Sequence, residues 1–100
     1  MTQYLIATSV LESIVRGSLE NDGRLRVHTP LPFVRTHPVE IAVEGDKCFV
    51  WVQLDARMGE HLPSLASAAR RTVAEALGSM TGLKVAAVDV SFNGVFPIGV

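Results

Sequence analysis

The stretch VEIAVEGDKCFVWVQLD, residues 39–55, predicts a β-hairpin and, with it, the organisation of a sheet. Apolar and polar residues alternate on both sides of Gly45-Asp46, and glycine followed by a polar residue suits a two-residue type II′ turn. This turn places Val43 opposite Cys48, and opposed residues share one face of the sheet. The face that we expect to enter the core carries Val39, Ile41, Val43, Cys48, Val50, Val52 and Leu54. The other face carries Glu40, Ala42, Glu44, Lys47, Phe49, Trp51, Gln53 and Asp55.

Two amphipathic helices are predicted, one on each side of this hairpin. Residues 8–23, TSVLESIVRGSLENDG, place Ser9 three positions before Glu12, which is the spacing of a capping box. The apolar stripe of this helix runs through Val10, Ile14 and Gly17, with Leu11, Val15 and Ser18 beside it. Residues 61–82, HLPSLASAARRTVAEALGSMTG, have Pro63 in the first turn, where its missing N–H is not needed. The apolar positions at helical spacing are Leu62, Leu65 or Ala66, Ala69, Val73, Leu77 and Met80.

A last strand is predicted in MTGLKVAAVDVSFNGV, residues 80–95. Gly82 stands where a left-handed residue would end the second helix. Val88, Val90 and Phe92 then share a face, whereas Val85 is out of phase with them and predicts a bulge or a late strand start.

The remaining segments predict a short strand and an irregular connection. RLRVH, residues 24–28, alternates polar and apolar residues, and TPLPFVRTHP, residues 29–38, contains three prolines that lack a donor for strand pairing. We therefore expect a single α+β domain over residues 1–100. It consists of a three- to four-stranded antiparallel or mixed sheet with two helices packed on one face.

Composition restricts the classes of function. The chain has 100 residues, a net charge of −1 and one cysteine, so no intrachain disulfide can form and a reducing cytoplasm is expected. Near-neutral charge gives no reason to expect nucleic-acid binding. No segment approaches the about 20 apolar residues that cross a bilayer. The N-terminal region has no basic leader and is expected to be mature protein.

No constellation of residues predicts catalysis, a metal or a cofactor. The histidines are His28, His37 and His61. None has the short spacing of a local metal motif. Cys48 falls on the expected core face, and Asp55 and Glu60 have the positions of solvated loop carboxylates.

Candidate partner-binding residues lie on the hairpin and on the second helix. Phe49, Trp51 and Gln53 project from the face opposite the core, and aromatic side chains are enriched at the centres of interfaces. The alternative is that the proline-rich segment or the apolar tail VFPIGV covers these rings. Arg70 and Arg71 form a small basic patch on the helix, which can be a partner contact or an ordinary solvated face.

MTGLKVAAVDVSFNGV closely resembles the C-terminal signature of the alkaline shock protein family, the envelope stress response family of Gram-positive and related bacteria. The matching positions are Met80, Thr81, Gly82, Leu83, Val85, Val88, Val90, Gly94 and Val95. The hairpin, Gly59 and the alanine-rich second helix follow the family order. Residues 24–38 match poorly, and the polar or charged tail of longer members is missing.

The resemblance implies a non-enzymatic cytoplasmic protein without catalytic or cofactor-binding residues. It would associate with itself as an oligomer or with a membrane-anchored protein partner, and so act in cell-envelope homeostasis near the inner face of the cell membrane. The alternative function, of a different class, is a small ligand-binding or regulatory module attached to a metabolic pathway.

Overall fold

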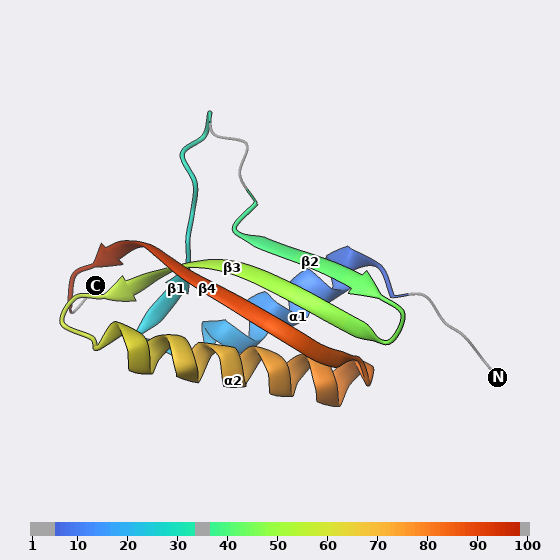
Figure 1. Cartoon of the computed structure of the whole chain (residues 1–100). Helices are drawn as coiled ribbons and strands as arrows, with labels where there is room; N and C mark the ends of the chain where they lie inside the picture. Colours follow the sequence, from blue (N-terminus) through green and yellow to red (C-terminus); the bar gives the residue numbers. More distant parts are fainter. Residues whose placement is uncertain (1–5, 34–36, 99–100) are drawn as a thin grey trace.

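The computed structural model describes residues 6–33 and 37–98, and within them the chain forms a mixed four-stranded sheet and two helices (Figure 1). The elements follow the predicted order: α1 (Thr8–Glu20), β1 (Leu25–Val27), β2 (Val39–Glu44), β3 (Lys47–Arg57), α2 (Leu62–Thr81) and β4 (Lys84–Phe96). The predicted fold class, α+β with an antiparallel or mixed sheet of three to four strands, is therefore confirmed, and the sheet is of the mixed kind.

The strand β3 pairs with every other strand. On one edge it is antiparallel to β2 and, further along, to the short β1; on its other edge it is parallel to β4 over its whole length. The register of the hairpin is the predicted one, with Val43 opposite Cys48 and Glu44 opposite Lys47. A type II′ turn requires a positive φ at its first central residue and a negative φ at its second. Gly45 has a φ of 61°, and Asp46 has a negative φ, since no described non-glycine residue has a positive one.

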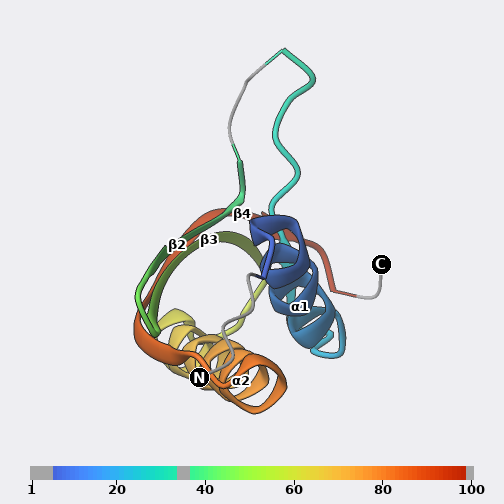
Figure 2. The same cartoon turned by 90° about the vertical axis from the view of Figure 1, so that its right-hand side faces the viewer.

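Both helices pack on one face of the sheet, which curves around them (Figure 2). A parallel neighbour requires a crossover connection, and α2 supplies it between β3 and β4. Alternate residues of β3 point into the layer between sheet and helices, because side chains of a strand alternate between its faces. The largest fully buried side chains of this layer are Leu11, Val15, Leu19, Val39, Cys48, Val50, Val52, Leu54, Leu65, Val73 and Leu77.

The details predicted for α1 are partly wrong. The N-cap is Ala7 and no side chain caps the helix, so Ser9 and Glu12 form no capping box. The buried stripe is Leu11, Val15 and Leu19. The predicted stripe through Val10 is offset by one residue from this buried stripe, and Val10 is half exposed. The reason is that α1 contacts α2 as well as the sheet and is rotated toward both.

Three predicted core positions at the ends of other elements are exposed. Val43 lies at the hairpin end of β2, Leu62 is the first residue of α2 and Met80 is at its end, and all three lie beyond the reach of the opposing layer. Between Leu62 and Met80 the apolar positions of α2 are buried as predicted; they are Leu65, Ala66, Ala69, Val73 and Leu77.

The signature residues build the corner between α2 and β4. Gly82 ends the helix in the left-handed conformation, with a φ of 76°, and its N–H donates to the carbonyl of Gly78 at 3.0 Å. The Thr81 hydroxyl donates to the carbonyl of Leu77 and accepts from the N–H of Leu83. The corner therefore satisfies backbone groups that a helix end otherwise leaves unpaired.

The strand β4 contains the predicted irregularity and a second one. Cys48 pairs with Val85 and Phe49 with Ala87, so Ala86 is an extra residue. The second register shift leaves Asn93 as the extra residue. The first bulge brings Val88, Val90 and Phe92 onto the helix side of the sheet, where they pack against the core.

The left-handed corner predicts that Gly82→Val destabilises the protein. A β-branched residue at positive φ is strained, and we expect the free energy of unfolding to fall by on the order of 1–3 kcal/mol. Urea denaturation followed by circular dichroism measures the change. Gly17→Ala in α1 is the matched control, since a Cβ there meets no atom within 4 Å and alanine favours a helix interior. Equal stability of Gly82→Val and wild type would contradict the role of the corner.

Candidate functional site

The face of the sheet opposite the helices is not covered by any described helix (Figure 2). Phe49 is partly exposed there and Trp51 is 44 % exposed, which confirms the side of the hairpin predicted for both rings. The described part of the connection between β1 and β2 projects away from the sheet (Figure 1). Its residues 34–36 and the last two residues of the tail, positions 99–100, lie outside the described residues. Within the described chain, this face, here called the outer face, is open.

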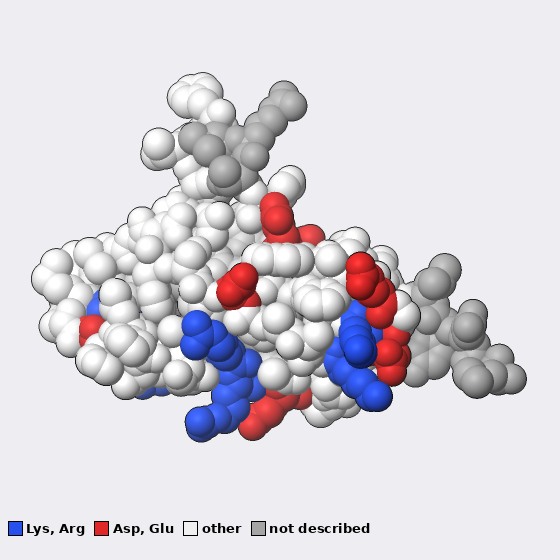
Figure 3. All heavy atoms as spheres, in the orientation of Figure 1, with Lys and Arg blue, Asp and Glu red and all other residues white. Residues whose placement is uncertain are grey.

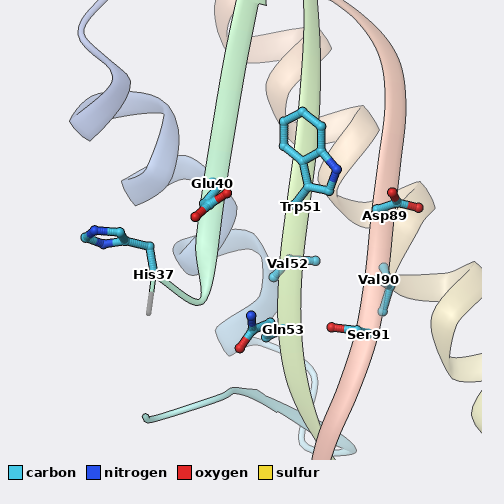
Figure 4. A pocket seen from close by; sticks show the side chains of 8 residues that line it. All are labelled: His37, Glu40, Trp51, Val52, Gln53, Asp89, Val90 and Ser91. Atoms are coloured by element: carbon cyan, nitrogen blue, oxygen red, sulfur yellow. The ribbon is translucent and has the colours of Figure 1, made fainter. Parts of the chain in front are cut away.

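A row of three side chains crosses the centre of the outer face. Trp51 on β3 pairs with Glu40 on β2 and with Asp89 on β4, so the indole stands between two carboxylates. Figure 4 shows the three side chains on the same side of the sheet, with the face of the indole ring turned outward. Glu40 and Asp89 are both exposed. Cross-strand neighbours on one face lie within side-chain contact, so the row is a single local surface.

An open hollow of about 440 Å³ lies over this row. It is lined by His37, Glu40, Trp51, Val52, Gln53, Asp89, Val90 and Ser91 (Figure 4). A second hollow of about 360 Å³ lies on the β2 side and shares His37, Glu40 and Trp51 with the first. The predicted site residue Gln53 therefore belongs to the same surface as Trp51. Its side-chain oxygen accepts from Asn93 Nδ2 at 3.3 Å, which fixes the amide at the margin of the hollow.

The basic patch predicted with these residues lies elsewhere. Arg70 and Arg71 are exposed on α2, which packs beside β4 on the other side of the sheet. Arg70 Nε donates to the backbone carbonyl of Val88 at 3.3 Å and so covers one polar group at the margin of β4. Figure 3 shows basic side chains at the lower border of the molecule, where α2 runs, with an acidic side chain beside them and further acidic side chains higher on the face. The fold thus brings Phe49, Trp51 and Gln53 together and leaves the two arginines apart from them.

A histidine–carboxylate pair occupies the far end of the outer face. His28 Nδ1 and Asp55 Oδ1 are 2.7 Å apart, and the ring donates when its proton is on Nδ1. The pair lies across Gly94, where a Cβ would come within 2.8 Å of Asp55 Oδ1. Next to it, the Arg26 guanidinium lies 4.0 Å from the centre of the Phe96 ring. Sequence reasoning missed this pair, since positions 28 and 55 become neighbours only through the pairing of β1 with β3.

The residues weighed for catalysis do not converge. Asp55 contacts His28, whereas Glu60 accepts from Arg57 Nη2 at 2.9 Å. His61 contacts Ser64 at the start of α2, and the described residues contain no group of three or more His, Cys, Asp or Glu that could hold a metal ion. Cys48 is fully buried, and burial raises the pKa of its thiol because the thiolate is poorly solvated there.

Comparison of the chain with protein-family models, curated proteins and solved structures gives no match. Within the described residues, no helix is long and apolar enough to cross a membrane.

The contact at Gly94 predicts an energetic coupling with Asp55. Gly94→Ala must displace the Asp55 carboxylate from His28, so we expect the free energy of unfolding to fall by about 1–2 kcal/mol. In the background of Asp55→Ala the obstacle is absent, and Gly94→Ala should then cost much less. Urea denaturation of the two single variants and the double variant gives the coupling energy. Additive effects would show that the carboxylate does not oppose the methyl group.

The burial of Cys48 predicts slow reaction with a thiol reagent in the native state. The rate should rise with urea in step with unfolding, since the thiol is reached when the protein opens. The raised pKa favours the protonated thiol in the folded state. The free energy of unfolding therefore includes a term from the protonated thiol that is fully present at lower pH. This term is lost as the pH rises above about 8.5, the pKa of a free thiol. Labelling kinetics followed by absorbance test this, and Cys48→Ala reports the background. Rapid native labelling would contradict the packing of β3.

Proposed function

We propose that this chain is a non-enzymatic protein of the alkaline shock, or envelope stress response, type that acts through self-association or through a protein partner. The observation that carries the proposal is the outer face of the sheet, with Phe49 and Trp51 on its central strand and no described element covering them. In this proposal the protein works in the bacterial cytoplasm, and a membrane-anchored partner holds it near the inner face of the cell membrane.

The roles of the signature residues support a binding function rather than a reaction. Thr81 and Gly82 close a helix end, and Gly94 makes room for the Asp55–His28 pair. Val88 and Val90 pack against the core. Each of these residues has a structural task, so the stretch that resembles the family maintains the fold on which the outer face is displayed.

The physical chemistry of the outer face supports the same proposal. Apolar surface left in water costs about 25 cal/mol for each Å², and large aromatic rings provide much of the binding free energy at interfaces. Trp51 is held on β3, which is paired on both edges, so the ring is presented with little backbone freedom to lose. A rigid aromatic group on a sheet is a common anchor for a protein partner.

The hollow over Trp51 supports a second candidate function, a small ligand-binding or regulatory module. Its polar lining includes His37, Gln53 and Ser91, which could orient a small molecule. The hollow is open rather than enclosed, however, and ligand sites usually surround most of the ligand surface. We therefore place this function second.

Replacement of both rings tests the proposed function. Phe49→Ser with Trp51→Ser should weaken self-association or partner binding by at least about tenfold and leave the fold intact, because the buried residues of β3 are unchanged. Analytical ultracentrifugation over a concentration series measures self-association. Affinity capture from bacterial extract, with cytosol and membrane fractions separated, measures partner binding, and circular dichroism reports the fold.

The control is Val10→Ser with Met80→Ser, which removes two exposed apolar side chains from the helices. This variant should associate as the wild type does. A wild type that stays monomeric at high concentration and captures no partner would reject the proposal. Unfolding of the Phe49→Ser, Trp51→Ser variant would show instead that these rings stabilise the domain itself.

A further inference from the structure

The two carboxylates beside Trp51 give the outer face a chemical preference. Glu40 and Asp89 lie on the strands either side of β3, which places them about 10 Å apart, two strand spacings, with the indole between them. Neither takes part in an ion pair or hydrogen bond within the described residues, in contrast to Asp22, Asp46, Asp55 and Glu60. Two unpaired anions that flank an aromatic ring are the complement of a cation.

The face of an indole ring attracts a cation, and a carboxylate accepts hydrogen bonds from it. A guanidinium group can use both interactions at once. Its flat surface stacks on the ring while the donors along its edges reach outward in the plane, toward carboxylates on either side. An ammonium group is a point charge without such a plane, so it matches this arrangement less well.

We propose that the row Glu40–Trp51–Asp89 binds an arginine side chain of a protein partner. This inference rests on the proposed function and names the chemistry of the partner. The hollow over the row gives an incoming side chain room to lie along the outer face between β2 and β4 (Figure 4).

The same charges argue against a second copy that docks through its own outer face. Two such faces in contact would bring four carboxylates into one interface, from two Glu40 and two Asp89 side chains. Like charges facing each other in an interface are strongly unfavourable. The observations therefore favour a basic segment of another protein as the occupant.

The test uses the full chain and the peptide acetyl-Gly-Arg-Gly-amide as the probe. Trp51 is the only tryptophan, so its fluorescence and the NMR signal of its indole N–H report binding at this position. We expect saturable binding of the arginine peptide, with the neutral citrulline peptide about tenfold weaker. The lysine peptide should lie between them, and salt should weaken the arginine complex.

Variants locate the site within the outer face. Glu40→Gln with Asp89→Asn keeps the size of both side chains and should weaken the arginine peptide on the order of tenfold. Glu44→Gln, also on β2 and on the same face, is the control: it removes one carboxylate outside the row and should leave binding unchanged. Equal binding of the citrulline peptide, or an equal loss in Glu44→Gln, would overturn the proposal. The proposal would also be overturned if the protein alone formed a dimer and Glu40→Gln with Asp89→Asn disrupted that dimer.

The two proposals fail in different ways. If Phe49→Ser with Trp51→Ser abolishes association while Glu40→Gln with Asp89→Asn retains it, the arginine site is rejected and the proposed function stands. If the arginine peptide binds the row but the chain associates with no protein, the affinity of the row for a guanidinium group stands, whereas the protein partner and the proposed function are rejected.

Discussion

The structure depends on the pairing of β3 on both edges while only one of its faces is buried. Its residues from Cys48 to Ala56 alternate between the core and the outer face, and this alternation sets the position of every other element. The antiparallel hairpin with β2 follows from a two-residue turn. The parallel pairing with β4 needs the long crossover through α2, which covers the apolar side of the sheet at the same time.

The corner at Gly82 and the bulge at Ala86 adapt β4 to this central strand. Without the extra residue, the pairing that starts with Cys48 and Val85 would place Asp89 opposite Val52, on the core side. The bulge changes the side of the residues from Ala87 to Phe92, so Val88 and Val90 turn inward and the Asp89 carboxylate turns outward. A single local irregularity therefore completes both the core and the row on the outer face.

The outer face and the core obey the same alternation but have opposite chemistry. Among the described residues, no polar or charged residue is buried on the core side, and burial of Cys48 favours its neutral thiol. On the outer side, one aromatic ring stands between two carboxylates that no described residue neutralises. The fold places both helices on one face, and this asymmetry leaves a charged, partly aromatic surface exposed.

The sequence by itself determined the features that depend on local periodicity and on backbone conformation. The hairpin register, the outward side of Trp51, the buried stripe of α2, the left-handed Gly82 and the irregularity after Val85 could all be read from neighbouring residues. The sequence places Glu40 opposite Trp51 for the same reason, although its role as a neighbour was not recognised there.

Only the tertiary structure decided which distant segments meet. It placed Asp89 beside Trp51, His28 beside Asp55 under the constraint of Gly94, and Arg70 at the margin of β4, away from the aromatic rings. It also decided the rotation of α1, because that helix packs against α2 and the sheet together. Periodicity fixes which side of an element a residue faces, but strand order and helix packing fix its neighbours, and these depend on burial over the whole chain.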